Sequence, residues 1–196
     1  MKKREFRDQE YWGLPVPGFG DPRAKVLILG LAPAAHGANR TGRMFTGDSS
    51  GRWLYGALNR AGLANQPQSE ARDDGMTLHG VYISATARCA PPDNKPLPEE
   101  IGNCAPFLDV EFELLKDRKL ILALGAVAFE AACRLLERHG LKIPRPKPRF
   151  RHGEMYTFSG QRVLASYHPS RQNTQTGRLT EGMWEEVFST VRELLR

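Results

Sequence analysis

Two kinds of hydrophobic pattern alternate along the chain. Mostly apolar runs, typical of buried strands, lie at 26–29, 80–85, 120–124 and 162–166, and the first of them is unbroken. Between and after them, apolar residues recur at helical spacing and predict helices over 49–61, 99–115, 126–138 and from 180 to the end of the chain. Strands that alternate with helices predict an α/β fold in which a mostly parallel sheet is sandwiched between helices.

The length of the chain fits one domain. A chain of 196 residues can build one core and is short for two, so we expect a single domain over 1–196. Residues 1–23 are charged and then rich in Gly and Pro, which predicts an irregular N-terminal arm. Residues 144–152 alternate proline with other residues, mostly cations, and must be extended. This segment is either a stiff linker or a row of charges for a phosphate backbone.

The charge balance favours a polyanionic partner without proving one. The chain has 28 Lys and Arg against 22 Asp and Glu, a net charge of +6. No stretch approaches the roughly 18 apolar residues of a membrane span, and the N-terminus has no apolar signal core. Three cysteines, an odd number, do not look like a disulfide framework. We therefore expect a cytoplasmic protein with no membrane partner.

Candidate chemistry lies in three loops, each at the end of a predicted strand. Asp48 closes a Gly-rich loop, Asn94 lies in a Pro-rich loop, and His168 directly follows the fourth strand. Each has a structural alternative: Asp48 could be a helix N-cap, Asn94 an Asx-turn residue, and His168 a packed histidine. Because the carboxyl ends of parallel strands meet at one edge of a sheet, where ligands bind, their common placement favours a shared site.

The motifs in these loops resemble those of a known family. They read GLAPAAHGANRTGRMFTGD at 30–48, RCAPPDNKP at 88–96 and YHPSRQNTQTGRLT at 167–180. With YWGLPVPGFG at 11–20 and PKPRFRHG at 146–153, they resemble the family-five, type B uracil-DNA glycosylases over nearly the whole chain. The resemblance implies a three-layer α/β/α sandwich around a central four-stranded, mostly parallel sheet, and uracil-containing DNA as the partner.

The resemblance also assigns catalytic residues. It places the active-site acid at Asp48, the base-contacting asparagine at Asn94 and the histidine of the His-Pro-Ser motif at His168. Other branches of the superfamily keep a water-positioning polar residue soon after the first strand, where this chain has Ala32-Pro33-Ala34, as type B does. Whether Asp48 activates water or only stabilises positive charge on the sugar stays open. Glycosidic cleavage makes the sugar cationic and the base anionic, so an acid and an imidazole suit opposite sides of the bond.

The predicted substrate contacts come from the same motifs. Ala32, His36 and Phe45 lie in the first-motif loop. Phe45 suits a stacking floor for a flipped base, and the alternative is a core position beside Met44. The alanines of this loop indicate a less discriminating pocket than that of strict uracil enzymes.

Duplex contacts are predicted from the third motif and from arginines. The resemblance puts the wedge that holds the emptied stack open at Arg171, Gln172 and Asn173, which are polar rather than apolar. The candidate phosphate contacts are Arg40, Arg43, Arg149, Arg151, Arg171 and Arg178.

Two cysteines are the candidate metal ligands. In the resembled family, the positions of Cys89 and Cys104 supply half of the four thiolates of a [4Fe-4S] cluster. The other pair would precede the segment 2–13, so we expect either a missing upstream segment or a cluster-free variant. The alternative is that both thiols are free and buried. Cys133, on the apolar side of a helix, is expected in the core.

Together these features predict a monomeric, monofunctional DNA glycosylase of the cytoplasm, nucleoid-associated in a prokaryote. It would hydrolyse the N-glycosidic bond of uracil and of other deaminated bases, hypoxanthine and xanthine. One rival takes 30–48 as the phosphate loop of a nucleotide hydrolase or transferase, but the loop lacks the Gly-Lys-Ser/Thr ending. A second rival is a module that binds damaged nucleic acid without cleaving it.

Overall fold

A six-stranded mixed sheet forms the centre of the computed structural model, which describes residue 2 and residues 4–195. Within these residues the strand order is β1-β3-β2-β4-β6-β5. The strands are β1 (Phe19–Gly20), β2 (Val26–Gly30), β3 (Val81–Ala85), β4 (Leu120–Leu124), β5 (Met155–Phe158) and β6 (Gln161–Ser166).

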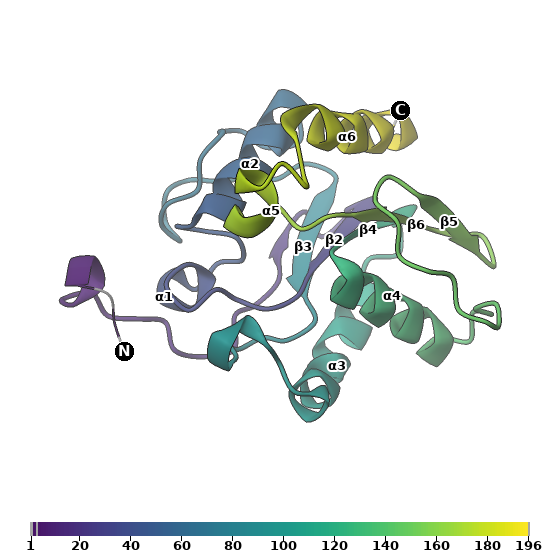
Figure 1. Cartoon of the computed structure of the whole chain (residues 1–196), viewed down its shortest axis with the longest axis horizontal. Helices are drawn as coiled ribbons and strands as arrows, with labels where there is room; N and C mark the ends of the chain where they lie inside the picture. The colour runs from purple at the N-terminus through teal and green to yellow at the C-terminus, as the bar shows by residue number, and fades with distance from the viewer. Residues whose placement is uncertain (1, 3, 196) are drawn as a thin grey trace.

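Helices cover both faces of the sheet, with α2 and α6 over one and α3 and α4 over the other (Figure 1). The helices are α1 (Ala38–Thr41), α2 (Ser49–Arg60), α3 (Pro98–Leu114), α4 (Ala126–Arg138), α5 (Arg171–Gln175) and α6 (Glu181–Leu195), with 3-10 turns η1 (Arg4–Phe6) and η2 (Pro92–Asn94). None of the helices in the described part is long and apolar enough to cross a membrane.

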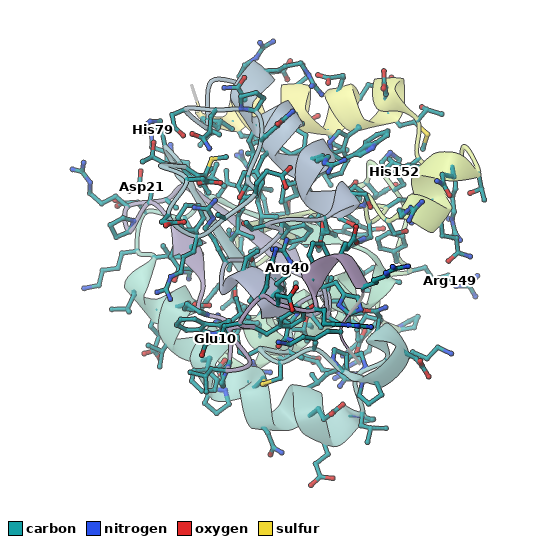
Figure 2. The ribbon with its side chains drawn as sticks, turned by 90° about the vertical axis from the view of Figure 1, so that its left-hand side faces the viewer. Glu10, Asp21, Arg40, His79, Arg149 and His152 are labelled. Atoms are coloured by element: carbon teal, nitrogen blue, oxygen red, sulfur yellow. The ribbon has the colours of Figure 1, made fainter. Side chains whose placement is uncertain are left out.

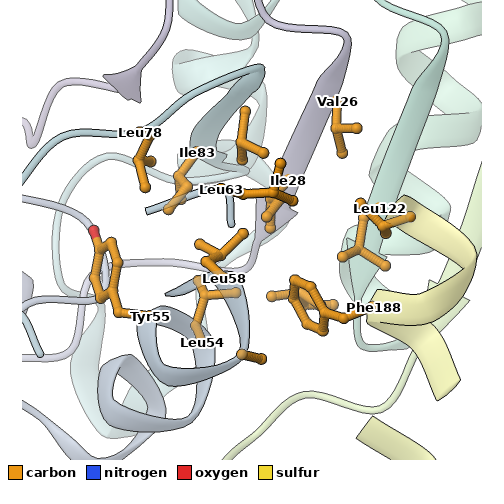
Figure 3. Close-up of a cluster of buried hydrophobic side chains, with 14 of the residues drawn as sticks. Val26, Ile28, Leu54, Tyr55, Leu58, Leu63, Leu78, Ile83, Leu122 and Phe188 are labelled. Carbon is orange, nitrogen blue, oxygen red and sulfur yellow. The ribbon is translucent and has the colours of Figure 1, made fainter. Parts of the chain in front are cut away.

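Alternate residues of the central strands face two separate cores. Ile28 of β2 pairs with Ile83 of β3 and Leu122 of β4, and all three pack against α2 and α6 (Figure 3). Leu27 and Leu29 face the opposite core, beneath α3 and α4. Every residue of β2 is buried, which explains why the run shows no polar alternation. The predicted three-layer sandwich is confirmed.

The sheet is wider than the four strands predicted. The central strands β3, β2, β4 and β6 are parallel, as expected, and an antiparallel strand lies at each edge. β5 forms the expected hairpin with β6. β1 comes from the arm expected to be irregular: Phe19 pairs with Ile83, and a Cβ on Gly20 would come within 2.3 Å of the Val81 oxygen. Two residues are too few to show a strand period, so the sequence gives no signal for β1.

A buried arginine joins the first-motif loop to the polar loop 65–77. Arg43 is 4% exposed, and its guanidinium lies 2.6 Å from Ser69 Oγ, 2.6 Å from Asp74 Oδ1 and 3.0 Å from the carbonyl oxygen of Arg72. A guanidinium enclosed in this way cannot reach a DNA phosphate. The prediction of Arg43 as a phosphate contact is therefore wrong, because Asp74 provides the internal partner that allows its burial.

The proline-alternating segment before β5 is paired to α4 at its start and exposes two arginines at its end. Arg145 and Lys147 pair with Glu137 of α4 at 2.7 and 3.1 Å, so this part straps the segment onto the helix. Arg149 and Arg151 are exposed and form no ion pair within the described residues. Two of the four cations therefore remain accessible to a polyanion.

Candidate active site

A cavity of about 1270 Å³ lies at the carboxyl ends of the four parallel strands. Residues that follow β2, β3, β4 and β6 all contribute to its wall. Asp48, Asn94 and His168 line this one cavity, so the structure brings together three residues that are far apart in the chain. Arg40, labelled near the centre of Figure 2, lies on the same wall.

Asp48 is both the N-cap of α2 and a wall residue. Its Oδ1 accepts a hydrogen bond from the backbone N–H of Gly51 at 2.8 Å. Its Oδ2 lies against Gly37, where a Cβ would come within 2.3 Å of that oxygen. Burial raises the pKa of Asp48 above its usual value, although the N–H of Gly51 opposes this. The N-cap alternative and a catalytic role are therefore compatible, because each uses a different oxygen.

Phe45 is held in the cavity by a strained backbone. Its φ is +55°, rare for a bulky residue. At Gly30 a Cβ would lie 3.0 Å from the Phe45 ring, and at Gly51 a Cβ would lie 1.7 Å from the Phe45 oxygen, so both glycines are needed for this arrangement. The ring stacks on that of His168, with centroids 5.8 Å apart and planes 28° apart. Met44 is buried in the core, and the half-buried Phe45 packs against the edge of the same cluster.

His168 presents a neutral imidazole. Burial lowers its pKa to about 4, so the ring is uncharged at pH 7. No residue of the described part forms a hydrogen bond to its ring nitrogens. Its backbone oxygen, in contrast, accepts hydrogen bonds from Asn173 Nδ2 at 2.9 Å and from the Ser170 N–H at 2.8 Å. The ring can donate to a ligand while the backbone is fixed.

Asn94 lies at the exposed end of the wall, in η2. It and Asp93 both have positive φ, at +56° and +52°, a conformation that Asn and Asp tolerate better than most residues. The backbone N–H of Asn94 donates to the Pro91 oxygen at 3.2 Å. Its side-chain amide has no hydrogen bond within the described residues, so the Asx-turn alternative is not what the structure shows.

The structure divides the predicted substrate contacts into two groups. Ala32, His36, Arg171 and Gln172 line the cavity. Asn173 does not, because its side chain is bound to the His168 oxygen. The stretch expected to be a loop is the short helix α5, which the Ser170 hydroxyl caps by accepting the Asn173 N–H at 3.3 Å.

The two candidate metal ligands lie near each other. Cys89 is exposed, and the pKa of its thiol is raised by burial of the sulfur and by the charge of Cys104. Cys104 Sγ accepts the backbone N–H of Arg88 at 3.4 Å. Over the described residues, however, no group of three or more His, Cys, Asp or Glu side chains could hold a metal ion. These two thiols alone do not complete a four-thiolate cluster site. Cys133 is in the core, as predicted.

Several residues that shape the cavity were not predicted from the sequence. Gly37 makes room for Asp48, and Asp93 stands beside Asn94 on the wall. Phe6, from the N-terminal arm, also lines the cavity, with the Arg40 guanidinium 4.3 Å from its ring centroid. The sequence shows four glycines between 30 and 47, but which side chain each glycine admits is visible only in the structure.

Comparison with known proteins agrees with this geometry. The model of the uracil DNA glycosylase superfamily matches residues 17–192. The chain belongs to this superfamily.

Within the superfamily, the chain is more similar to type-5 than to type-4 uracil-DNA glycosylases among the relatives compared. A type-5 uracil-DNA glycosylase from Thermus thermophilus is 54% identical over 195 residues, which are 98% of this chain and 86% of that protein. One from Mycobacterium tuberculosis is 52% identical over 196 residues, 99% of this chain and 72% of that protein. A type-4 enzyme from Pyrobaculum aerophilum is 32% identical over 156 residues, 79% of this chain and 71% of that protein. Similarity to the type-5 proteins thus extends over almost the whole chain.

The two buried titratable groups should titrate in opposite directions from their usual values. We expect the pKa of the Asp48 carboxyl to lie above 3.8 and that of the His168 imidazole to lie at about 4, because burial disfavours the charged form of each group. Carbon-13 and nitrogen-15 NMR titrations would measure this, with Asp48→Asn and His168→Gln used to assign the signals. A His168 midpoint near 6.5 would contradict the burial that the structure shows.

Proposed function

We propose that this protein is a monofunctional DNA glycosylase that hydrolyses the N-glycosidic bond of uracil in DNA and leaves an abasic site, the first step of base excision repair. The observation that carries the proposal is that Asp48, Asn94 and His168 line one cavity. Membership of the superfamily and the names of the type-5 relatives support it.

His168 acts on the departing base. Because its pKa is lowered to about 4, the ring is a neutral N–H donor at pH 7. As the bond between C1′ and the base nitrogen breaks, its electron pair moves into uracil, and a carbonyl oxygen of the base becomes anionic. A pre-aimed donor at such an oxygen contributes about 3 kcal/mol of transition-state stabilisation. The leaving uracil anion then takes a proton from solvent.

Asp48 acts on the opposite, cationic side of the broken bond. With Oδ1 held by the Gly51 N–H, Oδ2 is the oxygen left to face the sugar and the attacking water. The water oxygen forms the new bond to C1′, and its proton passes to the carboxylate. A raised pKa makes this carboxylate a better base, which favours water activation over a purely electrostatic role.

Phe45 and Asn94 hold the extruded base. The partly exposed Phe45 ring supplies a stacking surface at the cavity wall. The unbonded Asn94 amide has both a donor and an acceptor, which match a carbonyl oxygen and the neighbouring N–H of uracil. Since extrusion costs a few kcal/mol, least for a mispaired base, these contacts offset part of that cost.

The duplex is held around the cavity mouth. Arg171 and Gln172 are exposed at the start of α5 and project long polar side chains from the wall, which suits them to fill the gap left by the flipped nucleotide. Arg149, Arg151 and Arg178 are exposed and contact phosphates. These contacts position the duplex and carry no base specificity.

Other deaminated bases enter the same pocket. Ala32 and its alanine-rich neighbours place no polar side chain at the strand end, so the wall there tolerates the larger ring system of hypoxanthine or xanthine. Stacking on Phe45 does not depend on the identity of the base.

The protein acts as a monomer where DNA is found, in the cytoplasm and on the nucleoid in a prokaryote. All the residues assigned to catalysis and base binding come from one chain, so no second copy is needed to complete the cavity.

Single-turnover assays on labelled duplexes test the proposed reaction. The parent protein should release uracil and give strand breaks only after alkali, whereas a thymine duplex stays intact; duplexes with hypoxanthine or xanthine test the wider range. Asp48→Asn should slow excision on the order of 10²–10⁴-fold and His168→Ala on the order of 10²-fold. The exposed Asp117→Asn is the matched control and should keep the parental rate. Binding without any alkali-sensitive product would instead indicate a non-catalytic damage reader.

The space at Gly37 tests the role assigned to the Asp48 Oδ2. A methyl group there would overlap this oxygen, so Gly37→Ala should slow excision on the order of 10²-fold while binding of uracil-containing DNA changes little. In Gly182→Ala nothing lies within 4 Å of the added Cβ, and the parental rate should persist. An unchanged rate for Gly37→Ala would mean that Asp48 acts from elsewhere.

We further propose that Cys89 and Cys104 form one half of an iron–sulfur site. The other two thiolates would come from cysteines that are not among the described residues. The exposure of Cys89 and its electrostatic interaction with Cys104 support this, although the two thiols cannot hold the cluster by themselves. Anaerobic incubation with iron and sulfide should therefore give no stable absorbance near 400 nm with this chain. A chain extended upstream by a cysteine pair should become brown, and Cys89→Ser should abolish the colour. A colourless extended chain would remove the proposal.

A further inference from the structure

His152 closes the basic segment that ends before β5, and its ring touches the backbone next to His168. Its Nδ1 accepts a hydrogen bond from the backbone N–H of Tyr167 at 3.0 Å. Its ring stacks on the Tyr167 ring, with centroids 4.8 Å apart and planes 7° apart. The Arg178 guanidinium also lies over the Tyr167 ring, 4.7 Å from its centroid. In Figure 2, His152 is labelled between the ribbons of α5 and α6.

The contact completes a set of bonds on the backbone around His168. On the N-terminal side, His152 accepts the Tyr167 N–H, and the Ser166 hydroxyl donates to the Tyr167 oxygen at 3.0 Å. On the C-terminal side, Asn173 Nδ2 and the Ser170 N–H donate to the His168 oxygen. The peptide groups before and after His168 are thus both fixed, while the His168 ring itself is bonded to no described residue.

The direction of the Tyr167 bond determines the tautomer of His152. Because Nδ1 accepts, the ring proton of the neutral form is on Nε2, on the side of the Met183 carbonyl of α6. Burial lowers the pKa of His152, while the charge of Glu186 and the Met183 carbonyl oppose that shift. The Ser166 hydroxyl, 3.4 Å from Nδ1, is the other polar group on that side.

We propose that His152 is a positioning residue for the reaction: by accepting the Tyr167 N–H, it fixes the 166–167 peptide group, one before the peptide that leads into His168, and so helps to orient the His168 imidazole toward the base. The inference rests on the role proposed above for His168. It assigns no contact between His152 and the substrate, since His152 is absent from the cavity wall.

If His152 served only for packing, residue 152 would need a flat ring but no hydrogen-bond acceptor. Stacking on Tyr167 and filling the space beneath α6 need only a flat ring, which phenylalanine provides. Fixing the Tyr167 N–H needs an acceptor atom at the place of Nδ1, which the Oδ1 of asparagine approximates without the ring. His152→Phe and His152→Asn therefore separate packing from hydrogen bonding.

The test compares single-turnover excision with the affinity for the same uracil duplex. His152→Phe should lower the rate about 10- to 100-fold with the dissociation constant within twofold, because a misaimed donor affects the transition state more than ground-state binding. His152→Asn should recover the rate to within about threefold of the parent. The matched control is His139→Phe, since His139 also packs on an aromatic ring, that of Phe112, and lies outside the cavity wall. It should keep the parental rate.

Three outcomes would overturn the inference. A parental rate in His152→Phe would show that the acceptor is not needed, and equal losses in both variants would show that only shape matters. If the variants fold poorly, nitrogen-15 NMR of the parent decides: a proton on Nδ1 of His152 would exclude the bond. A parental rate in His168→Ala would instead remove the role proposed for His168, which separates that failure from this one.

Discussion

Parallel pairing of the four central strands is the constraint on which the site depends. Ile28 faces Ile83 and Leu122, and Leu122 faces Leu164, so the strands end at about the same level. Because these strands are buried on both faces, their backbone groups must pair with one another, and no strand can slide alone. The loops that follow therefore open into one cavity, which is how an acid, an amide and an imidazole from distant segments meet.

Above the ends of these strands, close approaches between backbone and side chains fix the positions of Phe45 and Asp48. Gly51 leaves room for the backbone oxygen of Phe45, which has a left-handed conformation, and Gly30 leaves room for the Phe45 ring. Gly37 allows the Asp48 oxygen to lie where a methyl group would be. Such strain is held only where the surrounding structure determines it, and it is typical of functional sites. Burial then sets the protonation states, raising the pKa of Asp48 and lowering that of His168.

The scaffold could be predicted from the sequence where its signals are periodic and several turns or residues long. Strand β4 and helix α4 have the bounds that their apolar patterns predict. The short elements β1, α1 and α5 could not be found, because two to five residues carry no recognisable period. For the site, Asp48, Asn94 and His168 follow from motifs at strand ends. Gly37 and His152 act through contacts between segments, which no local pattern records.

The buried Arg43 gives the polar loop 65–77 a structural role that its polar composition does not indicate. Its guanidinium joins this loop to the segment that continues into Met44, whose carbonyl oxygen accepts the Tyr55 hydroxyl at 2.8 Å, and into Phe45. Through these contacts the loop supports the segment that carries Phe45 and is not a loose connection. Splitting the chain there, or inserting a label, would disturb the segment that carries Phe45 in the cavity wall. Engineering of this protein is therefore better directed at the hairpin turn between β5 and β6.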